Sequence, residues 1–204
     1  MKTRILTMVA LMIMAVVTTK NTYANVTDNG NDEATVLTNV SRINKIEIRG
    51  NVELYVSDGE SDKVKVYNKY YSESALVQSQ NGVLRISSYN DQKLVVWVTA
   101  ADLRAIAAYD NAEVKSFGKL SKIELDVNLY DAATVTLNLD AYKANVTVND
   151  DAKANLAGRV NDINLEYAQP ANINNSSLMA VNVVKKQVPV NTVAKANIKE
   201  AKTL

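Results

Sequence analysis

An internal repeat with a period of about 20 residues, in the second half of the chain, is the feature that most constrains its fold. The repeat occurs four times, and each copy is centred on an alanine that recurs at nearly constant intervals: Ala112, Ala133, Ala152 and Ala171. Apolar residues at fixed positions before and after this alanine keep the same spacing. They are Ile106, Val127, Val146 and Leu165, then Ala108, Leu129, Val148 and Tyr167, then Val114, Val135, Ala154 and Ile173. Columns that hold one register through four copies indicate a structural unit.

Apolar and polar residues alternate within each repeat, which predicts short β-strands, and one such unit can bury its apolar side only by stacking on others. The sequence therefore predicts an all-β fold, a right-handed β-helix or β-solenoid with repeat units at about 103–183 and a β-hairpin region before them. Such a stack places Val127 beside Val146 on the next strand. It likewise places Leu129 beside Val148. A β-sandwich is the alternative fold, and in it these pairs need not touch.

The first half of the chain also shows the alternation of β-strands, from Ile46 onward. The dipeptide Asn81-Gly82 predicts a type I′ hairpin turn, because both central residues of that turn need positive φ. The nearly continuous apolar segment Leu94–Thr99 predicts a strand buried on both faces. The acidic segment Ser57–Lys63 lacks most of an EF-hand and is predicted to be a solvated hairpin loop.

The two ends of the chain differ from this body. Residues 1–24 combine early basic residues, an apolar run from Ile5 to Val17 and a small-residue site, which is typical of a signal peptide; an uncleaved anchor is the alternative. The run is short for a bilayer, so we expect export to the periplasm, the outer-membrane surface or the extracellular space, with no membrane span after cleavage. Residues 25–40 lack periodicity and predict a flexible leader. The predicted domain covers residues 41–183, and residues 184–204 form a basic tail.

Charge and composition narrow the classes of function. The chain has 23 basic and 22 acidic residues, and this net charge of +1 argues against a nucleic-acid-binding protein. It has no cysteine and no histidine. Disulfide bonds, a lipoprotein anchor, zinc sites built from Cys and His, and a Ser-His-Asp triad are therefore excluded. Scaffolding and binding are the simpler account of such a chain.

Three aspartates form a column at the bend of the first three repeats: Asp110, Asp131 and Asp150. Turn formation is the simpler interpretation, because an Asp side chain accepts backbone N–H bonds in tight turns. The alternative is a calcium site, since stacked carboxylates repel one another and a cation relieves the repulsion. With Lys115 and Lys153 nearby as proton acceptors, such a site also allows a polysaccharide lyase.

Two outward columns are further candidates for binding. Tyr109 and Tyr130 are predicted to stack, with Asn149 next in the column. A tyrosine platform of this kind could hold a sugar ring, and the simpler alternative is aromatic pairing that stabilises the sheet. The second column, whose side chains can form hydrogen bonds from one repeat to the next, consists of Asp126, Asn145 and Asn164.

The segments that precede the repeats are Ile43–Val56, Gly82–Ile86, Leu94–Thr99 and Leu103–Ile106. Together with the repeats they resemble the auto-transporter adhesin head, GIN-domain family of proteins secreted by Gram-negative bacteria. The resemblance implies a β-helix-type domain with a role in adhesion and no catalytic residues to transfer. The chain departs from the family in its turns, where Asp-x-Ala replaces the usual glycine-rich sequence.

We therefore expect a secreted, non-enzymatic surface or periplasmic module. Its expected partner is a glycan or a protein at the cell surface, bound through Tyr109, Tyr130 and Asn149. No cofactor is expected unless the aspartate column binds calcium. The alternative function is a calcium-dependent carbohydrate-active enzyme of the polysaccharide lyase type.

Overall fold

The computed structural model describes residues 34–37, 40, 42–67 and 75–188. These residues form β-strands and one short 3₁₀ turn, and no α-helix occurs among them. Within these ranges there is no helix of the length and apolar character that crossing a membrane requires. The signal peptide predicted at 1–24 lies outside the described residues. The all-β prediction is confirmed for the part of the chain that the structure describes.

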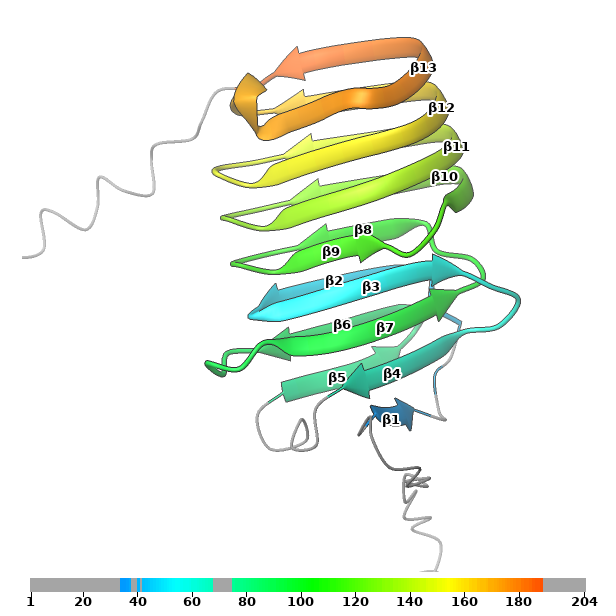
Figure 1. Ribbon diagram of the computed structural model, residues 1–204, viewed down its shortest axis with the longest axis vertical. Helices are drawn as coiled ribbons and strands as arrows, with labels where there is room; N and C mark the ends of the chain where they lie inside the picture. The colour runs from blue at the N-terminus through cyan, green and yellow to red at the C-terminus, as the bar shows by residue number, and fades with distance from the viewer. Residues whose placement is uncertain (1–33, 38–39, 41, 68–74, 189–204) are drawn as a thin grey trace, which may run out of the picture.

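The strands follow one another along most of the chain (Figure 1). In chain order they are β1 (Ala34–Leu37), β2 (Lys45–Gly50), β3 (Val52–Asp58), β4 (Lys63–Tyr67), β5 (Ala75–Gln80), β6 (Val83–Ser88), β7 (Leu94–Ala100), β8 (Ala105–Ala108), β9 (Glu113–Ser116), β10 (Leu120–Leu129), β11 (Thr134–Val148), β12 (Lys153–Tyr167) and β13 (Ile173–Gln187), with the 3₁₀ turn η1 (Pro170–Asn172) before β13. All of them belong to one curled, open sheet.

The curl divides the sheet into two rows of strands, with an apolar core between them (Figure 1). The β2 row contains β5, β6, β2, β8 and β10, and the β3 row contains β1, β4, β7, β3 and β9. Three long strands run through both rows. The first residues of β11, from Thr134, pair with β9, and its later residues, up to Val148, pair with β10. β12 and β13 continue the stack, so that β13 lies at one edge of the sheet.

The repeats pair in parallel with the register that the alanine spacing predicts. Val127 lies opposite Val146, which in turn lies opposite Leu165. Leu129 lies opposite Val148. All five side chains are buried in the core. The predicted neighbours within the apolar columns are therefore confirmed.

The N-terminal edge of the sheet differs from the repeats, because its strands pair antiparallel. β4 pairs with β1 and β7, and β5 pairs with β6. A tight turn joins β5 to β6, with φ of 52° at Asn81 and 80° at Gly82. The positive φ at both residues confirms the predicted hairpin turn.

Two predicted boundaries need correction. The flexible leader at 25–40 does not hold for Ala34–Leu37, which form the edge strand β1 because they pair with β4. The basic tail does not begin at residue 184, because β13 pairs with β12 as far as Gln187. The lysines near this end are thus part of an edge strand, where their side chains remain exposed.

β7 is buried on one face only, and not on both as the sequence predicts. Leu94, Val96 and Val98 point into the core, while the residues between them are partly exposed. Among the described residues the strands form two rows and no further layer covers them, so the outward face of each row is partly exposed. Aromatic neighbours cover part of this outward face at Trp97.

The acidic segment between β3 and β4 is solvated only at its tip. Asp62 accepts the backbone N–H groups of Ile43, at 2.6 Å, and of Ala101, at 2.8 Å. Asp58 accepts the N–H of Ser121 at 2.5 Å. The solvated-loop prediction is therefore wrong for these two aspartates, which hold neighbouring loops in place.

One corner of the stack contains a column of residues in the left-handed conformation, with φ between 52° and 78°: Gly50, Asp110, Asp131 and Asp150. The Asp110 carboxylate accepts the N–H of Gly50 at 3.1 Å. Asp131 accepts the N–H of Asp110 at 3.1 Å, and Asp150 accepts that of Asp131 at 3.2 Å. The prediction that these aspartates accept backbone N–H bonds at the turn is confirmed.

Replacing Asp131 with alanine should lower the free energy of unfolding by about 1–2 kcal/mol, because alanine lacks the acceptor and disfavours the left-handed conformation. Asp131→Asn should cost less, since asparagine tolerates this conformation and keeps one oxygen acceptor. Urea unfolding of the two variants measures the difference. Equal losses would contradict the turn-forming role.

Candidate functional site

The predicted tyrosine column lies at the corner where the strands of the β2 row end. Tyr109 follows β8, Tyr130 follows β10 and Asn149 follows β11. The two rings are parallel, with centroids 4.7 Å apart and an angle of 4° between their planes, so the predicted stacking is confirmed. The Arg49 guanidinium joins them, with its Cζ 3.7 Å from the centroid of the Tyr109 ring. These four residues are called the corner column below.

The stacking leaves little aromatic face for a sugar ring. β2 and β10 flank β8 on opposite sides, so Arg49 and Tyr130 cover the two faces of Tyr109. One face of Tyr130 is covered in turn, and Asn149 follows on the next strand, where its Nδ2 donates to the carbonyl oxygen of Leu129 at 3.0 Å. The corner column therefore offers ring edges and polar groups in place of the flat platform that the sequence suggests.

The aspartate column uses its carboxylates for the turn. Each of them accepts a backbone N–H, and Asp110 also accepts the Tyr89 hydroxyl at 3.3 Å. In the part of the chain that the structure describes, no three or more acidic side chains are grouped so that they could hold a metal ion. The geometry thus lends no support to a calcium site built from the predicted set, Asp110, Asp131 and Asp150.

Lys115, one of the two lysines considered as a proton acceptor, is bound by two glutamates. Its Nζ lies 2.6 Å from Glu53 and 3.1 Å from Glu113. These hydrogen bonds, the one to Glu53 above all, hold the pKa of Lys115 well above its ordinary value. A lysine kept protonated in this way is unsuited to accept a proton, so the lyase alternative finds no base at this residue.

An aromatic cluster that sequence reasoning missed lies on the outer side of the β3 row. The Trp97 ring stacks on Tyr55, with centroids 4.7 Å apart and an angle of 22°. The Tyr67 and Phe117 rings also contact Trp97, at centroid distances of 6.3 and 5.0 Å. Phe117 is 61% exposed. The alternation of β3 and β7 places Tyr55 and Trp97 outward, so their pairing could have been found once β3 was paired with β7.

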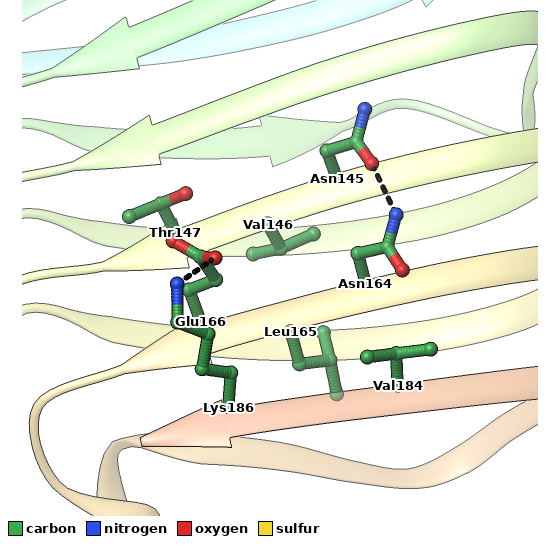
Figure 2. Close-up of a pocket in the computed structure, with 8 residues that line it drawn as sticks. All are labelled: Asn145, Val146, Thr147, Asn164, Leu165, Glu166, Val184 and Lys186. Carbon is green, nitrogen blue, oxygen red and sulfur yellow. Dashed lines mark hydrogen bonds and ion pairs between the residues drawn. The ribbon is translucent and has the colours of Figure 1, made fainter. Parts of the chain in front are cut away.

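Sequence reasoning also missed a hollow of about 280 Å³ on the outer side of β11, β12 and β13 (Figure 2). It lies between two columns of outward side chains that cross these strands. One column consists of Asn145, Asn164 and Val184, and the other of Thr147, Glu166 and Lys186.

The first of these columns carries the hydrogen bonds that the sequence predicts for Asp126, Asn145 and Asn164. Asn145 Nδ2 donates to Asp126 at 2.7 Å, and Asn164 Nδ2 donates to the Oδ1 of Asn145 at 2.8 Å. On β13 the next position is Val184, so the series of amides stops there. An irregularity in the pairing of β12 with β13 shifts the register of β13 out of step with the preceding repeats, which is why the repeat alone does not reveal the hollow.

One protein family matches most of the chain. The sequence model of the family described as "Putative auto-transporter adhesin, head GIN domain" matches residues 42–204. No curated protein sequence matches the chain.

Several solved structures share the fold. A putative adhesin from Parabacteroides distasonis is 16% identical, with a TM-score of 0.59 over 78% of this chain and 79% of that chain. A putative adhesin from Bacteroides fragilis is 15% identical, with a TM-score of 0.50 over 78% and 98%. A putative lipid binding protein from P. distasonis is 11% identical, with a TM-score of 0.54 over 78% and 79%. At these identities the likeness concerns the fold alone.

Proposed function

The chain belongs to the family described as "Putative auto-transporter adhesin, head GIN domain", and from this membership we propose that it is an exported, non-enzymatic module that binds a glycan or a protein at the cell surface. Two of the similar structures carry the name adhesin, and the third carries the name lipid binding protein. These names support a binding role, and none of them refers to an enzyme.

The body of this module is proposed to be a right-handed β-helix, or β-solenoid. Support comes from the parallel pairing of β10 with β11 and of β11 with β12, in which each residue lies opposite its equivalent in the next repeat. Connections between parallel strands of one sheet are right-handed in about 98% of cases. Each repeat then adds one outward side chain to every column, so a binding surface can extend along the stack.

The corner column is the observation that carries the proposal. Its side chains come from neighbouring strands and hold one another in place, through the stacked rings of Tyr109 and Tyr130 and the guanidinium of Arg49. Side chains that are fixed before binding lose little conformational entropy when the ligand arrives. Tyrosine edges beside an amide and a guanidinium can donate to and accept from the hydroxyl and amide groups of a glycan or a protein.

The double variant Tyr109→Ala/Tyr130→Ala should bind its partner at least about tenfold more weakly, because tyrosines at the centre of an interface often dominate the affinity. A glycan array and a panel of immobilised extracellular proteins measure the loss. Tyr142→Ala is the matched control, since Tyr142 is an exposed tyrosine on β11 outside the column. A folded double variant that binds every partner as well as the unchanged protein would overturn the role of the corner column.

A further inference from the structure

The hollow on β11–β13 contains a hydrogen-bond acceptor with a fixed direction. An ionised Asp126 carboxylate can only accept, so Asn145 must donate to it through Nδ2. The Oδ1 of Asn145 then accepts the Nδ2 of Asn164. Asn164 consequently turns its own Oδ1 away from Asn145, on the side of Val184 at the rim of the hollow (Figure 2). Among the described residues no side chain or backbone group donates to this oxygen.

The other side of the hollow is charged. Glu166 Oε1 and Lys186 Nζ lie 3.1 Å apart, and Thr147 precedes them in the same column. Val184, which is 58% exposed, adds an apolar surface below Asn164 (Figure 2). Acceptors, a donor and a small apolar surface are thus gathered around one depression.

We propose that this hollow binds one ring of a neutral saccharide. The sugar hydroxyls donate to Asn164 Oδ1 and to the Glu166 carboxylate, and they accept from Lys186. A C–H face of the ring packs on Val184. These interactions use both hydrogen-bonding directions of a hydroxyl group, which few other small neutral ligands offer together with an apolar face.

The charge and the size of the hollow further restrict the class of ligand that it can bind. An anionic group would meet the Glu166 carboxylate, which repels it, and the Asn164 oxygen, which cannot donate to it, while the Lys186 ammonium is already paired with Glu166. The volume of about 280 Å³ lies just below the roughly 300–1,000 Å³ of sites for drug-sized ligands, so a single ring fits better than a larger molecule. The hollow shares no residue with the corner column, although Asn149 of that column lies two residues beyond Thr147, and the proposal does not depend on the role proposed for the tyrosines.

Titration of ¹⁵N-labelled protein with glucose, galactose and mannose, followed by NMR, tests the proposal. We expect saturable shifts for at least one sugar, concentrated in residues 145–147, 164–166 and 184–186. Asn164→Leu should weaken this binding roughly tenfold, because it removes one hydrogen bond to the sugar. Asn155→Leu is the matched control, since Asn155 is an exposed asparagine on the first half of the same strand, β12.

A second pair of variants blocks the hollow without removing a polar group. Val184→Tyr should fill it and abolish the shifts. Val181→Tyr makes the same change at another exposed valine of β13 and should retain them. The unfolding midpoint of each variant, measured in parallel, separates loss of the site from loss of the fold.

Three results would overturn the proposal. The first is that none of the three sugars gives a saturable shift in these segments. The second is that folded Val184→Tyr binds as well as the unchanged protein. The third is that glucuronate binds as tightly as glucose. If Tyr109→Ala/Tyr130→Ala loses its partner while the sugar shifts persist, the result supports two separate sites.

Discussion

Gly50→Ala should lower the free energy of unfolding by about 3 kcal/mol or more, several times the loss expected for Gly118→Ala. Both glycines have a left-handed backbone, with φ of 78° and 81°, so alanine meets a similar backbone penalty at each. The surroundings differ. A Cβ on Gly50 would collide with the carbonyl oxygen of Ser88, whereas among the described residues no atom beyond Gly118 and its chain neighbours lies within 4 Å of a Cβ on Gly118.

The Ser88 carbonyl cannot move aside without further loss. It accepts the N–H of Asn51 at 2.6 Å, and Ser88 lies buried opposite Gly50 in the pairing of β2 with β6. Gly118→Ala has only the left-handed penalty, about 1 kcal/mol. Urea unfolding followed by circular dichroism compares the two variants. Similar losses at both sites would show that the close approach of β6 to Gly50 contributes little.

Gly50 also shows how far the sequence can predict the fold. The N–H of Gly50 donates to the Asp110 carboxylate, so Gly50 begins the column of left-handed residues that continues with the three aspartates. In the sequence, however, Gly50 and Asp110 are 60 residues apart. The columns from Ala112 to Ala171 are visible because consecutive repeats stack on one another. β2 joins the same stack by pairing with β8, although five strands, β3 to β7, lie between β2 and β8 in the chain. None of these five strands lies between β2 and β8 in the sheet. A spacing rule cannot detect a neighbour of this kind.

In the corner column, too, the repeat predicts a contact between successive copies but not a contact with a residue outside the repeats. The stacking of Tyr109 on Tyr130 follows from the repeat, because these residues occupy one position in successive copies. The guanidinium of Arg49 comes from β2, outside the repeats, and its contact with Tyr109 changes the site. The cation covers the aromatic face that a sugar would have used, so the predicted platform becomes a polar edge.

The hollow lies where β13 departs from the repeat in two ways. On β13, Val184 occupies the position that Asn145 and Asn164 hold on β11 and β12, and the pairing of β13 with β12 includes one extra residue on β13. Residue spacing identified the bonds between Asn145 and Asn164, but a periodic pattern has no information about where it is interrupted. The hollow lies where the period fails, and the register of the folded strands is needed to locate it.

Asp58, which sequence reasoning assigned to a solvated loop, instead joins the end of β3 to the start of β10. Its Oδ1 lies 2.5 Å from Lys122 Nζ, and its Oδ2 accepts the N–H of Ser121 at 2.5 Å. The Lys122 side chain is only 7% exposed, compared with 29% for Asp58. The ammonium group therefore depends on this carboxylate more than the carboxylate depends on the ammonium group.

Asp58→Asn should lower the free energy of unfolding by about 3 kcal/mol, because it leaves the nearly buried Lys122 ammonium without a counter-charge. Lys122→Met should cost less, since the more exposed Asp58 can be hydrated and the methionine keeps the apolar contacts of the lysine stem. The double variant Asp58→Asn/Lys122→Met should then be more stable than Asp58→Asn alone. Urea unfolding of the two single variants and the double variant measures this coupling. Glu124→Gln, which disrupts the exposed Glu124–Lys143 pair, is the control and should leave the midpoint nearly unchanged. A double variant that is less stable than Asp58→Asn would show that the isolated lysine charge is not the cause of the loss.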